Sequence, residues 1–177
     1  MDQAQMLIIV DMLNDFCKPD GVLYCGDTVP EVIKSIENRL EVARSTKIPI
    51  IWLCDAHEEN DEEFKKFPPH AVIGTWGSEI VDELAPVPES ENEFIVEKTR
   101  YSGFYKTDLD NFLTIYNAHI VEVVGVCTSI CVMDTVGGLA NRNITTVVRE
   151  NCVTDFDPEA HSFSIKRMKN IYGAEII

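Results

Sequence analysis

Short apolar segments rich in β-branched residues alternate along the chain with longer segments of helical periodicity. Buried strands have nearly continuous apolar sequences, whereas an amphipathic helix repeats its apolar positions every three or four residues. The patterns predict strands at 6–10, 48–54, 93–96, 120–126, 145–149 and 175–177, and helices at 29–45, 108–117, 129–142 and 158–170. Short buried strands that alternate with helices indicate a mostly parallel sheet covered on both faces. We therefore expect an α/β fold, a doubly wound αβα structure of three layers.

One segment departs from this alternation. Residues 55–88 are acidic at first and then rich in Pro, Gly and Trp. Long loops inside compact domains usually carry function. No repeat, low-complexity tract or long linker interrupts the rest of the chain, so we expect residues 1–177 to form a single domain.

Polar residues suited to chemistry follow the predicted strands at their carboxyl ends. Asp11 follows the first strand, Asp55 and His57 follow the second, and Lys98 follows the third. Cys131 lies just beyond the fourth. Parallel α/β sheets form their sites at this edge, so we expect these side chains to meet there.

Cys131 lies where the predicted helix 129–142 begins. Thr128 and Ser129 are residue types that cap helices, which places Cys131 in the first turn. Free backbone N–H groups and the helix dipole favour a thiolate there, close to donors for an oxyanion. Most cysteines are simply small buried side chains, and for Cys131 taken alone that interpretation stays open.

Asp11 and Lys98 are suitable partners for such a nucleophile. A cysteine that attacks an acyl carbon needs a group that accepts its proton and later donates one, which a carboxylate of raised pKa can do. A lysine beside both would balance the charges of thiolate and carboxylate. Taken separately, Asp11 is equally a strand-end residue and Lys98 a surface lysine.

A second group of residues is suited to metal binding. Asp55 and His57 project to the same side of an extended segment, and His70 closes the site from the far end of the loop. One carboxylate and two imidazoles with open positions suit Zn²⁺, Mn²⁺ or Fe²⁺. Glu63 is a candidate further ligand, although the acidic run 58–63 is also typical of a solvated face.

Composition limits the classes of partner and the cellular compartment that we expect for this protein. The formal charge of −15, from 15 basic and 30 acidic residues, argues against nucleic acid and anionic membranes as partners. The first residues lack a basic region and no apolar run is long enough for a membrane span, so we expect a cytoplasmic protein. Free thiols are then expected for the six cysteines, although Cys17 and Cys25 could pair across a short loop.

Nearly the whole chain resembles the isochorismatase-like cysteine hydrolases, and among these it looks most like the nicotinamidases. The resemblance rests on segments 9–16 (IVDMLNDF), 55–57 (DAH), 67–70 (FPPH), 74–77 (GTWG), 98–104 (KTRYSGF) and 125–132 (GVCTSICV). It implies a Rossmann-type fold, with Asp11 as general base and acid, Lys98 as electrostatic partner and Cys131 as nucleophile. The family's oxyanion hole corresponds to the backbone N–H groups of Cys127 and Cys131, and its cis peptide to Val126–Cys127.

The resemblance also implies one divalent ion, zinc before manganese or iron, which binds the pyridine nitrogen of nicotinamide. Its ligands would be Asp55, His57 and His70. Phe16, Phe67 and Tyr101 match positions that pack around the ring, although buried aromatic residues are often ordinary core. A small amide is then the expected partner, and homo-oligomers occur in the family.

Two positions depart from the family pattern. Leu13 stands where many members have Gln, which removes a polar group near the nucleophile. Ser129 stands where many have Asp, so a neutral cap would replace a negative charge. These departures affect the substrate more than the reaction.

Two alternatives to a nicotinamidase remain open on the sequence. The first is a metal-free amidohydrolase acting on a ureido or carbamoyl compound. The second is a redox protein in which Cys127 and Cys131 form a reversible pair. Hydrolysis of isochorismate itself fits less well, because relatives of that type lack the cysteine and the metal histidines.

Overall fold

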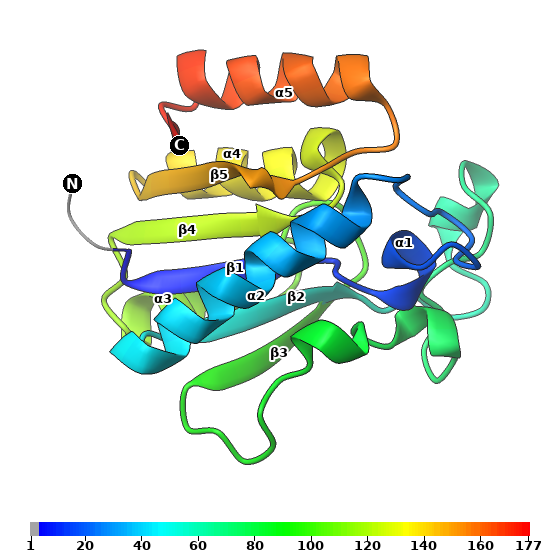
Figure 1. Ribbon diagram of the computed structural model, residues 1–177, viewed down its shortest axis with the longest axis horizontal. Helices are drawn as coiled ribbons and strands as arrows, with labels where there is room; N and C mark the ends of the chain where they lie inside the picture. Colours follow the sequence, from blue (N-terminus) through cyan, green and yellow to red (C-terminus); the bar gives the residue numbers. More distant parts are fainter. Residues whose placement is uncertain (1–3) are drawn as a thin grey trace.

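The computed structural model describes residues 4–177 and contains one sheet whose neighbouring strands are all parallel. The strands are β1 (Met6–Val10), β2 (Ile50–Asp55), β3 (Glu93–Lys98), β4 (Ile120–Gly125), β5 (Thr145–Val153) and β6 (Glu175–Ile176). Their order is β3-β2-β1-β4-β5-β6 (Figure 1). The order reverses between β1 and β4, where doubly wound sheets form their sites. The predicted α/β class and parallel sheet are confirmed.

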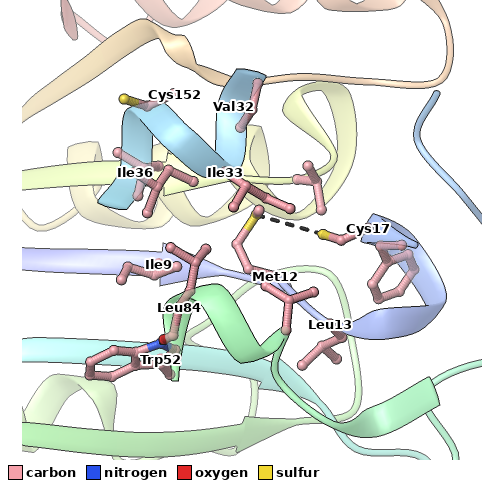
Figure 2. Close-up of a cluster of buried hydrophobic side chains, with 14 of the residues drawn as sticks. Ile9, Met12, Leu13, Cys17, Val32, Ile33, Ile36, Trp52, Leu84 and Cys152 are labelled. Atoms are coloured by element: carbon pink, nitrogen blue, oxygen red, sulfur yellow. Dashed lines mark hydrogen bonds between the residues drawn. The ribbon is translucent and has the colours of Figure 1, made fainter. Parts of the chain in front are cut away.

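Helices cover both faces of the sheet (Figure 1). They are α2 (Val29–Thr46) on one face, and α3 (Leu109–Ile115), α4 (Met133–Ala140) and α5 (Pro158–Asn170) on the other. Successive residues of β1 serve the two apolar cores, because side chains along a strand point alternately to opposite faces. Ile9 packs with Ile36 of α2 (Figure 2), whereas Ile8 packs in the core beneath α3 and α4.

The helix predicted at 129–142 is divided in the structure. It begins as a π-helical turn, Thr128–Val132, in which the Val132 amide donates to the Cys127 carbonyl over 3.2 Å, and continues as α4. Single π turns occur often at functional sites, and Cys131 lies within this one. The other predicted helices and all six strands occur, with β5 extending four residues beyond its predicted end.

The short helices near the site had no periodic signal in the sequence. They are α1 (Asn14–Cys17) and three 3₁₀ turns inside the loop, Glu62–Lys65, Trp76–Ser78 and Asp82–Leu84. The buried carboxylate of Asp15 in α1 accepts a hydrogen bond from the Ala71 amide over 2.8 Å. The Asn14 amide group donates to the Trp76 carbonyl over 2.9 Å. These contacts fix the loop against α1 beside the carboxyl ends of the strands.

Gly125 ends β4 just before the π-helical turn. Its φ angle is +117°, and a Cβ atom there would lie 2.1 Å from the Val10 carbonyl oxygen. Only glycine accepts both the positive φ and this close approach of β1 to β4.

Within residues 4–177, none of the helices combines the length and apolarity that crossing a membrane would require. Residues 1–3, which contributed to the expectation that no signal peptide opens the chain, lie outside the described residues.

Candidate active site

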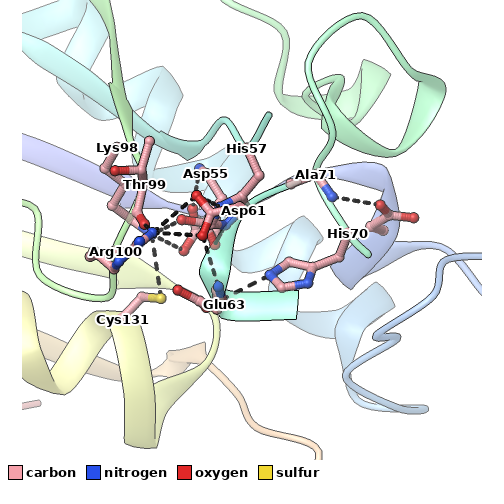
Figure 3. A network of polar contacts seen from close by, with 12 residues as sticks. Asp55, His57, Asp61, Glu63, His70, Ala71, Lys98, Thr99, Arg100 and Cys131 are labelled. Atoms are coloured by element: carbon pink, nitrogen blue, oxygen red, sulfur yellow. Dashed lines mark hydrogen bonds and ion pairs between the residues drawn. The ribbon is translucent and has the colours of Figure 1, made fainter. Parts of the chain in front are cut away.

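The ammonium group of Lys98 lies among three acidic or nucleophilic side chains (Figure 3). Its Nζ atom is 2.8 Å from Asp11 Oδ2, 2.5 Å from Asp55 Oδ1 and 3.4 Å from Cys131 Sγ. The four side chains are almost completely buried. The structure therefore brings together the residues that the strand ends predicted to meet.

Burial and charge set the protonation of this group. Burial, reinforced by the charge of Asp55, raises the pKa of Asp11 to about 6, although Lys98 opposes the shift. Burial lowers the pKa of Lys98, but the charges of Asp11 and Asp55 outweigh it and hold the pKa well above its usual value. Burial also raises the pKa of the Cys131 thiol, and the lysine offsets only part of this. The resting thiolate expected from the first-turn position is therefore disfavoured, because burial and the nearby carboxylates outweigh the effect of Lys98.

The backbone before the nucleophile leaves one amide unused. The Val126–Cys127 peptide is cis, as the resemblance implies. The Thr128 amide donates to the Thr154 carbonyl over 2.9 Å, whereas the Cys127 amide donates no hydrogen bond within residues 4–177. A free N–H group beside Cys131 is the kind of donor that an oxyanion hole requires.

The expected neutral cap at the nucleophile turn is wrong. Neither Thr128 nor Ser129 caps the turn through its side chain. Instead, the Ser129 amide donates over 2.7 Å to the carboxylate of Asp155, a buried residue that follows β5. A negative charge therefore does reach this turn, from a different part of the chain. Leu13 is fully buried in the apolar core beside Met12 (Figure 2).

Asp55, His57 and His70 form a buried cluster that fits a metal ion. Each offers a ligand atom, and these atoms lie within 4.8 Å of one another. Neither ring nitrogen of His57 makes a hydrogen bond within the described part of the chain. His70 uses Nδ1 toward the Pro68 carbonyl over 2.8 Å, which leaves Nε2 for a ligand. Buried nitrogens without partners are costly, and a divalent ion would satisfy them.

Glu63 lies next to this cluster, on the first 3₁₀ turn of the loop (Figure 3). Its Oε1 atom is 3.9 Å from His70 Nε2, and its Oε2 atom is buried without a hydrogen-bond partner among the described residues. The position suits the further ligand suggested by the sequence. It is not the solvated carboxylate that the acidic run would favour.

Asp61 is a site residue that the sequence interpretation missed. Its Oδ2 atom is 3.2 Å from His57 Nδ1, and Arg100 Nη1 donates to both of its carboxylate oxygens over 2.9 and 3.0 Å. Burial raises the pKa of Asp61, but the Glu63 amide, which donates to Oδ1 over 2.8 Å, together with Arg100 and His57 lowers it to about 2. The i, i+4 spacing from His57 was the one available signal, hidden within the acidic run.

Asp11, Asp55 and Cys131 also bring three ligand atoms within 4.8 Å of one another. The Lys98 ammonium group already contacts all three side chains. A cation in this cluster would meet that positive charge, so the structure favours a metal only at the histidines.

A cavity connects the nucleophile with the histidine cluster. The predicted aromatic residues Phe16, Phe67 and Tyr101 all line it, as do Cys131 and His70. The sequence interpretation missed three further apolar residues in its wall. They are Leu23 from the segment after α1, Ile130 from the π-helical turn and Phe156 from the segment after β5.

The comparisons with known proteins agree with this geometry. Residues 5–177 match the model of the isochorismatase domain. The structure of nicotinamidase PncA from Bacillus subtilis is 31% identical, with a TM-score of 0.93, and the match covers 98% of this chain and 99% of that one. N-carbamoylsarcosine amidase from Thermoplasma acidophilum is 29% identical, with a TM-score of 0.86 and coverage of 98% and 95%.

A third solved structure was determined with a metal. Pyrazinamidase of Pyrococcus horikoshii in complex with zinc is 27% identical, with a TM-score of 0.89 and coverage of 99% of both chains. The family model spans nearly the whole chain, and these neighbours share its complete fold. The chain therefore belongs to the isochorismatase family of hydrolases, among which it is nicotinamidase-like.

Proposed function

We propose that this protein is a nicotinamidase, which hydrolyses nicotinamide to nicotinate and ammonia through a thioester on Cys131. The observation that carries this proposal is a cavity lined by both Cys131 and His70 and by aromatic side chains in its wall, Phe16, Phe67 and Tyr101. A planar heteroaromatic amide needs those elements together: a nucleophile at its carboxamide, a ligand for its ring nitrogen and apolar faces for its ring.

In the first half of the reaction, Cys131 attacks the carboxamide carbon and its proton passes to Asp11. Ligand atoms of these two side chains lie within 4.8 Å of each other, and Lys98 contacts both. The negative charge that develops on the carboxamide oxygen is stabilised by the backbone N–H groups of Cys127 and Cys131. Asp11 then returns the proton to the nitrogen, the C–N bond breaks, and ammonia leaves.

In the second half, water hydrolyses the thioester. Asp11 takes a proton from the water while the water oxygen attacks the acyl carbon. The C–S bond then breaks, Asp11 returns the proton to the Cys131 sulfur, and nicotinate leaves. A pKa of about 6 suits a group that must accept and release a proton in each half. Lys98 stays charged throughout, because its two carboxylate neighbours stabilise the ammonium form.

Asp55, His57 and His70 would hold the divalent ion, with Glu63 beside them. When bound, the ion supplies a Lewis acid that ligates the pyridine nitrogen of the substrate. Phe16, Phe67 and Tyr101 line the same cavity. Their rings would exclude water from the heteroaromatic ring and orient its carboxamide toward the nucleophile.

A second candidate substrate is a ureido or carbamoyl compound. The similarity to N-carbamoylsarcosine amidase favours it, because that neighbour shares the fold over nearly the whole chain. Such a substrate has no pyridine nitrogen, so its turnover would not depend on His57 or His70.

Ammonia release from nicotinamide and from an N-carbamoyl amino acid, with metal analysis of the purified protein, tests the proposal. We expect metal-dependent turnover of nicotinamide that is abolished in Cys131→Ala and strongly reduced in His57→Ala. Cys152→Ala is the matched control, because Cys152 is also buried but lies in the core against α2. Turnover of the carbamoyl compound alone, unchanged by chelation, would refute the nicotinamidase assignment.

A further inference from the structure

Two cysteine side chains that the proposed reaction does not use meet at the cavity wall. The Sγ atoms of Cys25 and Cys127 are 3.2 Å apart, although 102 residues separate them in the sequence. Cys25 precedes α2 and is 1% exposed, whereas Cys127 is 6% exposed and lines the cavity. The pairing differs from both cysteine pairs suggested by the sequence, Cys17 with Cys25 and Cys127 with Cys131.

This contact joins two parts of the active site. Cys25 is anchored beside Leu23, whose carbonyl accepts a weak hydrogen bond from the Cys25 thiol over 3.7 Å, and Leu23 lines the cavity. Cys127 contributes the free backbone amide described above. A covalent bond between the two sulfurs would therefore tie the cavity wall to the proposed oxyanion donor.

We propose that Cys25 and Cys127 form a reversible disulfide that switches the enzyme off, with peroxide as the oxidant. A sulfur–sulfur bond is about 2 Å long, so the two sulfurs need to approach by only about 1 Å. The small oxidant enters through the cavity, which Cys127 lines and Cys25 does not. The inference goes beyond the proposed deamidase activity, and the bond can be detected without that activity.

The chemistry balances with peroxide as the one added reagent. The Cys127 sulfur attacks one peroxide oxygen and the O–O bond breaks, which yields a sulfenic acid and, with the thiol proton, one water. The Cys25 sulfur then attacks the Cys127 sulfur, the S–O bond breaks, and the departing hydroxide takes the Cys25 proton as a second water. Two thiols are oxidised and one peroxide is reduced to two waters. The hydrogen bond with Cys25 and burial both raise the pKa of Cys127, so the first step is slow and requires excess peroxide.

The bond would act on catalysis through the Cys127 amide. Drawing the Cys127 sulfur toward Cys25 displaces the adjoining backbone, and displacements of about 1 Å at a reacting centre cost up to about 100-fold in rate. We expect the oxidised protein to lose at least about tenfold in turnover and to regain it with a dithiol reductant.

Peptide mapping of Cys131→Ala tests the bond alone. After peroxide treatment and alkylation of the remaining thiols, cleavage before aspartates separates Cys25, on peptide 20–26, from Cys17, on peptide 15–19. Cys127 is then the one cysteine on peptide 110–133. We expect peptides 20–26 and 110–133 to be joined and to be lighter than their sum by two hydrogens. The peroxide dose is one that oxidises Cys131 in the wild-type protein. If Cys25 and Cys127 are both found alkylated after that dose, the proposal is overturned. A disulfide that joins peptide 15–19, instead of peptide 20–26, to peptide 110–133 would overturn it too.

Activity measurements on Cys25→Ala and Cys17→Ala test the consequence. Both variants keep Cys131, so direct oxidation of the nucleophile affects them equally. Neither substituted side chain lines the cavity, and the activity before oxidation should match the wild type. We expect Cys17→Ala to lose more activity than Cys25→Ala, in which only direct oxidation of Cys131 remains, and to regain that difference with a dithiol reductant; equal losses would overturn the switch. If no amide is turned over at all, the proposed function fails, while the mapped bond still decides the inference.

Discussion

Asp55 takes part in two neighbouring groups that differ in how well their polar atoms are satisfied. On one side, its Oδ1 atom contacts Lys98, whose ammonium group also reaches Asp11 and Cys131. On the other side, its Oδ2 atom is 3.7 Å from His57 Nε2, which has no hydrogen bond within residues 4–177. The two groups are comparably buried, and residues of both line the cavity.

The difference between the two groups is the cation. The lysine group has one, and it contacts both buried carboxylates and the thiol, including Asp11 Oδ2, an oxygen with no other partner among the described residues. Among residues 4–177, no lysine or arginine contacts His57, His70 or Glu63, and a bound ion would satisfy their unpartnered atoms. We therefore expect the stability contributed by the first group to depend on Lys98, and the stability contributed by the second group to depend on bound metal.

Removal of the Lys98 ammonium group should have the largest effect on stability and activity. Lys98→Met leaves Asp11 and Asp55 buried without their partner, which typically costs about 3–5 kcal/mol in the free energy of unfolding. Loss of the positive charge beside the reacting atoms should also lower kcat by about 100- to 1,000-fold. Urea unfolding and ammonia release measure the two effects.

Lys65→Met is the matched control, since Lys65 also pairs with a carboxylate, that of Glu62, but both side chains are more than 70% exposed. Exposed pairs contribute about 0–1 kcal/mol, so this variant should unfold near the wild-type midpoint. Equal losses in the two lysine variants would show that the compensation described for Lys98 is wrong.

Metal removal should have the next largest effect, confined to the histidine group. Saturation of a site at 100 times its dissociation constant stabilises a protein by about 2.7 kcal/mol. For a chain of this size that corresponds to a thermal shift of about 5–10 °C. We expect zinc to raise the unfolding temperature of the chelated wild-type protein and of Cys131→Ala equally. His70→Ala should show no such shift, and a full shift in that variant would contradict the assigned ligands.

Asp61→Asn should weaken metal binding without destroying the site. The carboxylate faces His57 Nδ1 and is held by Arg100, so its removal changes how the ring is oriented and polarised. Loss of such a partner typically lowers metal affinity about 10- to 100-fold, which competition with a chromophoric chelator can measure. Asp110→Asn is the control, because Asp110 is likewise held by an arginine, Arg142, but on the surface. Identical zinc affinities for both variants and the wild type would leave Asp61 without this role.

The sequence predicted those site residues that the sheet itself brings together. Asp11, Asp55 and Lys98 end or follow strands that are neighbours in the sheet, so their proximity follows from strand order and register. The apolar periodicity also located the helices, because each buries one face against the sheet. His70 was proposed as a ligand residue at the far end of the loop from Asp55 and His57, and the family motif supported it; periodicity gave no signal, because its position depends on a loop.

The residues that were missed depend on contacts between loops. Asp61 lies in an acidic run that resembles a solvated surface, and its role follows from the turn that places it against His57. Asp155 lies beyond β5, and its contact with Ser129 joins segments 26 residues apart. Spacing and composition do not predict such contacts, because an aspartate in a loop is most often exposed or caps a local turn.

Asp155→Asn should produce the smallest of these effects. It tests the turn that carries Cys131, the member of the lysine group that acts as nucleophile. The variant keeps an acceptor for the Ser129 amide but loses its charge, which should cost about 1 kcal/mol in stability. Because the turn carries the proposed oxyanion donors, kcat should fall several-fold while KM stays constant. Asp157→Asn is the control, since Asp157 caps α5 and asparagine caps equally well. A change in KM alone, or equal changes in both variants, would assign Asp155 a structural role that does not reach the nucleophile.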